Sequence, residues 1–273
     1  MKAKLSKIIL LLFVFSFLTV GGSLTTKAQE FNFNRANSDY LYNYGLYRQS
    51  YNEYVAAKQA YLKYQTLTSK TEALEKTKQM LKNQDEVIKT YLTALRLKLA
   101  ETSGISEYEQ NILYLKLDSE IAWFAKHQEE IQSAGSLDDL ADSAKDGKEQ
   151  YQKTEILIYE SLGGILASKE TGLREEINQK IKELKDKIGE IRLKGDKKTA
   201  LAERWLLEAE NRLTRSQEKQ FAAQQILSSL KVSNTNKAGD YNQAQFAFEE
   251  SHQYLKDANS YLKEVLREIK SAD

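Results

Sequence analysis

Apolar residues recur at alternating spacings of three and four along almost the whole chain from residue 38 onward, which is the periodicity of amphipathic α-helices. The breaks between these runs carry helix start and stop signals. Ser69 with Glu72 and Ser106 with Glu109 form capping-box patterns, and Gly104 suits the left-handed residue after a helix end. The sequence therefore predicts about seven helices, near residues 38–65, 69–101, 106–133, 137–168 and 173–193, then from the Gly195–Asp196 turn to 230, and after a polar linker at 233–240.

The last two predicted helices each carry a regular seam with the a/d spacing of knobs-into-holes packing. Because the connection between them is short, we expect them to be antiparallel neighbours. The first seam consists of Ala202, Leu206, Ala209, Leu213, Ser216, Gln220, Ala223, Leu227 and Leu230. The second consists of Ala244, Phe248, Ser251, Leu255, Ala258, Leu262, Val265 and Ile269.

Long amphipathic helices with short connections predict an all-α fold, an elongated up-and-down helical bundle or a set of antiparallel coiled-coil hairpins. The expected organisation is a signal peptide at 1–28, a short extended segment at 29–37 and a helical bundle at 38–273. A candidate division separates 38–168 from 169–273. The pair Gly163-Gly164 is a candidate kink within the fourth predicted helix.

Tyrosines are concentrated in the first predicted helix, where eight of the sixteen lie between positions 40 and 64. One interpretation is a packed seam, which we favour because apolar stripes at helical spacing are usually buried. The other is an exposed aromatic face that binds a glycan, a peptide or a partner helix. Tyr42 and Tyr64 project from other faces. The candidate interaction face consists of Tyr40, Tyr44, Tyr47, Tyr51, Tyr54 and Tyr61.

Residues 156–167 form the most apolar stretch after the N-terminal segment. Two interpretations compete: a buried part of the bundle, with Gly163 and Gly164 allowing close helix approach, or a membrane-inserting segment of a helical toxin. We favour the buried part, since twelve residues with Glu160 among them are too few and too charged to cross a bilayer.

The first 28 residues have the form of a secretory signal peptide. Three lysines precede an apolar run at 8–20, which is shorter than the roughly 20 residues of a membrane-spanning helix. Ala28 offers a small residue for cleavage before Gln29. We expect an exported protein, located in the periplasm, at the cell surface or outside the cell. Release after cleavage is favoured over retention by an uncleaved segment, which would be the only membrane contact.

Composition narrows the classes of function. The chain has 40 basic and 39 acidic residues, and the signal peptide contains four of the basic ones, so the mature chain has a net charge of −3. Such a balance argues against nucleic-acid binding, which needs a basic patch. With no cysteine, disulfides, thiolate metal sites and cysteine nucleophiles are excluded. The absence of proline favours long helices over loop-built sites.

Catalytic signatures are missing from the sequence. No phosphate loop, nucleophile elbow or zinc-binding helix motif occurs. Glu249 and His252 have the Glu-x-x-His spacing of di-iron bundles, but His127 has Phe124 where the second glutamate is needed. Glu129 and Glu130 are interpreted as an exposed helical face. We therefore expect no enzyme activity, no catalytic residue, no cofactor and no metal.

Residues 239–244, Gly-Asp-Tyr-Asn-Gln-Ala, with Phe248 following, resemble the turn and second helix of a tetratricopeptide repeat. In that family a small residue and an aromatic residue pack between paired helices, and repeat arrays bind peptides. The resemblance covers about a dozen residues and no 34-residue period accompanies it. It therefore implies a helical hairpin at this place.

These patterns favour an exported, non-enzymatic helical protein that acts as a structural or protein-binding module, with another protein or a second copy as its partner. The alternative is a periplasmic chaperone or adaptor that clasps clients between helical hairpins, with an apolar inner groove and flexible tips.

Overall fold

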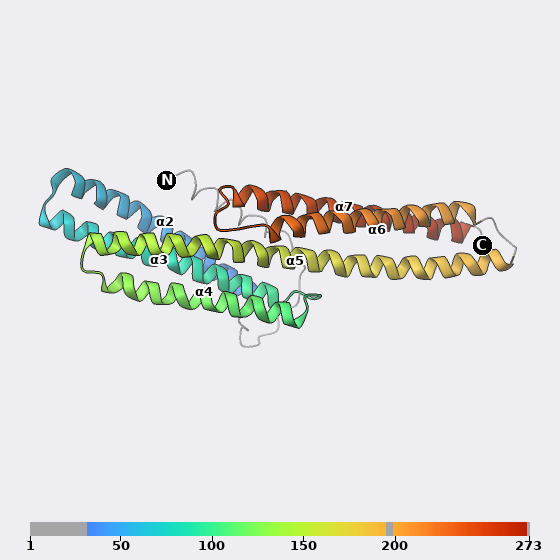
Figure 1. The fold of residues 1–273 in the computed structure, drawn as a ribbon, viewed down its shortest axis with the longest axis horizontal. Helices are drawn as coiled ribbons and strands as arrows, with labels where there is room; N and C mark the ends of the chain where they lie inside the picture. The colour runs from blue at the N-terminus through green and yellow to red at the C-terminus, as the bar shows by residue number, and fades with distance from the viewer. Residues whose placement is uncertain (1–31, 195–198, 272–273) are drawn as a thin grey trace. The chain divides into compact units, whose positions relative to one another are not determined.

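The computed structural model describes residues 32–194 and 199–271, and every regular element in these residues is an α-helix. The predicted signal peptide and the predicted Gly195–Asp196 turn lie outside the described residues. All the helices belong to one unit, Phe33–Asp273. They are α2 (Phe33–Tyr64), α3 (Leu67–Ala100), α4 (Glu107–Ser133), α5 (Leu137–Lys194), α6 (Ala200–Ser228) and α7 (Lys237–Ser271) (Figure 1).

The predicted break between residues 168 and 173 does not occur, so the fourth and fifth predicted helices are one helix, α5, of 58 residues. The described residues thus contain six helices where about seven were expected. Tertiary contacts hold the helix together at this point: Glu170 accepts a hydrogen bond from Ser251 of α7, and Thr171 accepts one from Gln220 of α6.

Helix starts differ from the expected ones at two places. α2 begins at Phe33 rather than Ser38, so the segment predicted to be extended is helical from Phe33 onward; the Phe33 amide donates to the Glu101 carboxylate, 3.2 Å away. α3 begins after Thr66, which is the N-cap in place of the expected Ser69. Ser69 is instead the third residue of the helix and forms the capping box with Thr66. By contrast, Ser106 caps α4 as predicted, and Gly104 has a positive φ of 88°.

Consecutive helices are antiparallel, as the up-and-down prediction requires. Along α6 and α7, contacts join Trp205 to Tyr261, Ser216 to Ser251 and Lys219 to Glu250. The residue numbers rise in α6 as they fall in α7, so the two helices are antiparallel. α7 is parallel to α5, because Tyr159 stacks on Tyr241 and Glu170 bonds to His252, both partners lying 82 residues further along. Figure 1 shows α6 and α7 lying along α5 from before its middle to near its carboxyl-terminal end.

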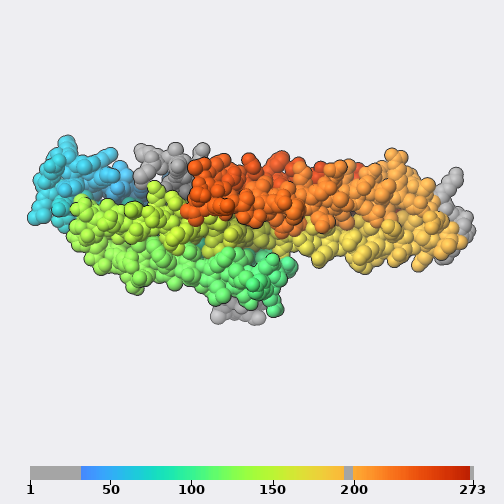
Figure 2. Space-filling model, in the orientation of Figure 1, coloured from blue at the N-terminus to red at the C-terminus, as the bar shows by residue number. Residues whose placement is uncertain are grey.

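The seams predicted in the last two helices are confirmed. All nine residues of the first seam are buried, eight of them in α6 and Leu230 just after its end. Seven of the eight in α7 are also buried, while Ile269 is partly buried against them. Apolar residues of α5 complete this core at Ile177, Ile181, Leu184 and Ile188. In the space-filling view the orange surface of α6 lies directly against the yellow surface of α5 (Figure 2).

A second core lies at the other end of α5 and involves α2, α3 and α4. It contains Tyr47, Met80, Leu81, Ile131, Ala134 and Leu140. The 58-residue helix therefore belongs to two cores, contributing Leu140 to one and Ile177 to Ile188 to the other.

Candidate functional site

The tyrosine stripe of α2 faces α3. Tyr40 and Tyr47 are buried, and the other four members are half-buried. Tyr40 makes an edge contact with Tyr91 of α3, with ring centroids 5.4 Å apart, and burial raises the pKa of Tyr40 and Tyr47 to about 12. These contacts are those of helix packing. A role of the six tyrosines as an interaction face stays a prediction.

The apolar stretch at 156–167 is part of α5 and is largely buried, as the interior interpretation predicted. α5 and α6 pack closely at Gly163, since a Cβ added there would lie 2.1 Å from Leu227 Cδ1. No helix in the described residues is long and apolar enough to cross a membrane.

His127 of α4 is buried between two acceptors. Its Nδ1 lies 2.7 Å from Asp85 Oδ2 of α3, and its Nε2 lies 2.9 Å from the Ser143 carbonyl of α5. A carbonyl can only accept, so Nε2 carries a proton, and a second proton is shared between Nδ1 and the carboxylate. Burial alone would lower the pKa of His127, but Asp85 and the Ser143 carbonyl outweigh it and raise that pKa.

A polar layer interrupts the core shared by α5, α6 and α7. The hydroxyls of Ser216 and Ser251, both at seam positions, lie 2.9 Å apart. Ser251 also donates to Glu170 over 3.3 Å, and the other oxygen of that carboxylate lies 3.0 Å from His252 Nδ1. On the α6 side, Arg174 of α5 donates to Ser216 over 3.4 Å.

Gln220 completes the layer and joins α6 to α5. Its amide nitrogen donates to the Ala167 carbonyl and the Thr171 hydroxyl, at 3.2 and 3.0 Å, while its oxygen accepts from Arg174. Since every one of these bonds crosses between helices, the layer determines the register in which the three helices pack.

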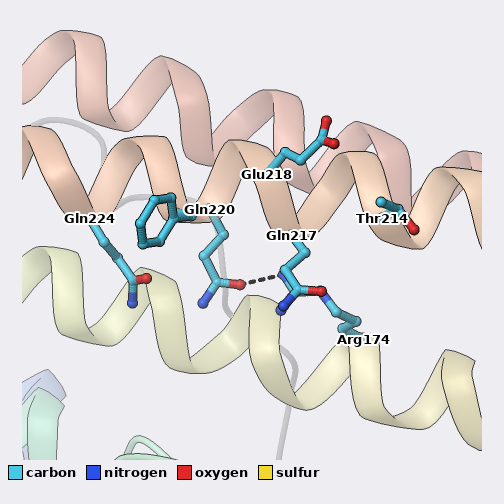
Figure 3. A pocket seen from close by; sticks show the side chains of 7 residues that line it. Arg174, Thr214, Gln217, Glu218, Gln220 and Gln224 are labelled. Carbon is cyan, nitrogen blue, oxygen red and sulfur yellow. Dashed lines mark hydrogen bonds between the residues drawn. The ribbon is translucent and has the colours of Figure 1, made fainter.

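An open cavity of about 430 Å³ adjoins this layer on the face formed by α5 and α6. Figure 3 shows Arg174 reaching from α5 toward Gln220 and Gln217 of α6. The lining consists of Arg174, Thr214, Gln217, Glu218, Gln220, Phe221 and Gln224. This cavity, with the Arg174 guanidinium at its wall, is the candidate functional site.

The sequence analysis did not identify Arg174 or Glu170 as site residues. The available signal was the presence of Ser216, Gln220 and Ser251 at seam positions that are otherwise apolar. Polar residues at such positions need partners in the core. Ser216 and Ser251 are partners of each other, but the remaining partners lie on α5, outside both seams, and could not be found in sequence.

The two histidines considered for metal chemistry take other partners. His252 pairs with Glu170 instead of Glu249, and His127 pairs with Asp85. Among the described residues, no group of three or more acidic or histidine side chains could hold a metal ion. Glu129 and Glu130 are exposed, as predicted.

The resemblance to a tetratricopeptide repeat corresponds to a real hairpin. Tyr241, Ala244 and Phe248 are buried near the start of α7, and the Tyr241 ring stacks on Tyr159 of α5 at 4.6 Å. Comparison with protein-family models, curated proteins and solved structures found no match to this chain.

Proposed function

We propose that this chain is an exported, non-enzymatic helical protein that acts as a structural or protein-binding module. The observation that carries the proposal is α5. At about 1.5 Å per residue its 58 residues extend for about 87 Å, and a separate helical core packs at each end. A helix packed in this way holds two groups of helices at set positions along one axis, which is the property of a spacer or scaffold. The groups overlap between Glu155, which pairs with Lys237 of α7, and Ser168, which donates to the Ser103 carbonyl.

The interior polar groups support a structural role. Asp85 bonds to His127, and Glu170 bonds to His252. In each pair the two residues come from different helices. Such bonds hold helices in one register.

The test of the spacer is a distance measurement by pulsed electron paramagnetic resonance. Because the chain has no cysteine, labels attach only at Glu149→Cys and Lys182→Cys, two exposed positions of α5. About 33 residues at 1.5 Å predict a narrow distribution near 50 Å. The same protein unfolded in urea is the control and should give a broad distance distribution. A broad or much shorter distribution without urea would contradict the proposal.

Export is tested separately by fusing alkaline phosphatase after residue 273. We expect activity with the full chain and its loss when residues 2–28 are removed, because phosphatase folds only after export to an oxidising compartment. Equal activity from both fusions would reject export without affecting the spacer.

A second candidate function, an adaptor that contacts proteins through a hairpin tip, is favoured by the turn between α2 and α3. Leu62, Tyr64 and Leu67 surround this turn and are all exposed, Leu67 at 81%. Exposed apolar side chains gathered at one place mark protein contacts.

The tip is tested by photocrosslinking in cells with a benzophenone amino acid at Leu67, and at the exposed Lys187 as a control. The adaptor function predicts a discrete adduct at position 67 only. Absence of an adduct at position 67, or the same adducts at both positions, would reject it.

A further inference from the structure

Arg174 is a half-buried cation with no bonded carboxylate. One terminal nitrogen, Nη2, donates to the neutral groups of Ser216 and Gln220. The Nε atom is buried and has no hydrogen-bond partner, and Nη1 forms no hydrogen bond within the described residues. By contrast, the arginines of α6 and α7 that form ion pairs do so at the surface, as Arg215 does with Glu218.

Nearby carboxylates do not offset the burial of Arg174. Glu170 bonds to Ser251 and His252 and forms no ion pair with Arg174 within the described residues. Burial lowers the pKa of the Arg174 guanidinium, and the charges of Glu170 and Glu175 oppose this only in part. A charge that loses water without gaining an anion destabilises the fold unless a ligand supplies the anion.

The cavity beside Arg174 has the size and lining for a small ligand. Its volume of about 430 Å³ lies within the range of small-molecule sites. Thr214, Gln217 and Gln224 present hydroxyl and amide groups, and Phe221 is 58% exposed. The one acidic residue in the lining, Glu218, is paired with Arg215 at 3.5 Å.

We propose that this cavity binds a small organic carboxylate with an apolar body, whose carboxylate pairs with Arg174 and whose apolar part packs on Phe221. Arginine suits this role because its planar guanidinium matches the geometry of a carboxylate. The amides of Gln217 and Gln224 supply further donors for the ligand. The site goes beyond the spacer function, because a spacer needs no ligand.

The test is titration of the purified chain with benzoate, followed in ¹H–¹⁵N spectra of the arginine Nε groups and by the melting temperature. We expect a saturable shift of the Arg174 Nε signal and a rise in melting temperature, since binding to the folded state stabilises it. Acetate, which lacks the apolar body, should bind more weakly. Sulfate at matched ionic strength should give neither effect.

Variants assign the binding to the site. Arg174→Gln should lose about tenfold or more in benzoate affinity, the size expected for hydrogen bonds to a charged group. Arg204→Gln, which removes an exposed cation of α6 away from the cavity lining, is the matched control and should retain it. Phe221→Ser should weaken benzoate more than acetate. Circular dichroism checks the fold, and Arg174→Lys, which keeps the charge, is the second variant if Arg174→Gln does not fold.

Three results would overturn the proposal: no saturable shift with benzoate, equal affinity in the Arg174 and Arg204 variants, or the same response to sulfate as to benzoate. None of them bears on the distance measured along α5, so the site and the spacer function fail independently.

Discussion

At the scale of single residues, the buried proton between Asp85 and His127 links stability to pH. The pKa of His127 is raised in the folded chain, mainly by Asp85 acting against burial. A raised histidine pKa stabilises the fold fully below the unfolded value of about 6.5, and this stabilisation is lost as pH rises through the folded pKa. Stability should therefore fall as the pH rises above about 6.5.

Replacing Asp85 separates the charge from the hydrogen bond. Asp85→Ala should lower the free energy of unfolding by about 3 kcal/mol at pH 6, because it leaves His127 buried without its partner. Asp85→Asn should cost less, since an amide can donate to neutral Nδ1, and it should abolish the fall in stability above pH 6.5. Urea unfolding at pH 6 and pH 8.5 measures both effects.

The control for this pair is Asp118→Asn, which breaks a half-exposed ion pair with Arg96. We expect a change within about 0.5 kcal/mol at either pH. If Asp85→Asn retained the pH dependence of the unmodified chain, another group would have to carry it.

At the scale of elements, the glycines of α5 have two different environments. A Cβ at Gly163 would meet the buried Leu227 side chain of α6, whereas a Cβ at Gly189 would have no atom within 4 Å. Glycine lowers helix stability at both positions. Only at Gly163 is there a compensating reason for it, the close approach of α6.

Alanine at these two glycines should therefore act in opposite directions. Gly189→Ala should stabilise the chain by about 0.5–1 kcal/mol through helix propensity. Gly163→Ala should destabilise it by about 1 kcal/mol, because Leu227 must move within a packed core. Thermal unfolding of both variants gives the comparison, and equal stabilisation would show that α6 has room to shift.

The tyrosine stripe offers a second comparison within one element. Tyr47→Ala should lower the free energy of unfolding by about 3 kcal/mol, because a buried aromatic side chain is removed. Tyr42→Ala on the exposed face of α2, where Tyr42 is 68% exposed, should change it by about 0.5 kcal/mol or less. An unchanged melting temperature in Tyr47→Ala would favour the interaction face over packing.

At the scale of the whole molecule, α5 couples the two cores because both depend on one helix. The two tryptophans report on them separately, Trp123 on α4 and Trp205 on α6. Trp205 packs against the core of α5, α6 and α7, and Trp123 stacks on His127 with ring centroids 4.8 Å apart.

Proline at the exposed Glu175 should destabilise the core of α5, α6 and α7 more than the core of α2, α3 and α4, because α6 and α7 pack on α5 on both sides of this residue. Glu175→Pro removes a backbone hydrogen bond in the middle of α5 and should cost about 3 kcal/mol or more. Fluorescence in Trp123→Phe and Trp205→Phe backgrounds should then show two unfolding midpoints in place of one. Glu107→Pro is the control: it follows the extended Ser106 at the first position of α4, where proline is tolerated. Coincident midpoints in Glu175→Pro would contradict this difference.

The sequence by itself determined the all-helical fold and the buried faces of α6 and α7. Spacing alone predicted the seams of α6 and α7, because a side chain's position around a helix depends only on its distance along the chain. Local capping chemistry likewise placed the start of α4 at Ser106. The same reasoning predicted the up-and-down order, since short connections leave consecutive helices little choice but to be antiparallel.

Only the tertiary structure decided the continuity of α5 and the partners of the buried polar groups. No local sequence signal predicted that the two halves of α5 form one helix. Contacts of Glu170 with α7 and of Thr171 with α6 stabilise the helix there, and these contacts exist only in the folded chain. Asp85 and His127 are 42 residues apart, and Glu170 and His252 are 82 apart, so no spacing within one helix relates them. The unpaired charge of Arg174 has the same origin, since it follows from which helix faces meet around it.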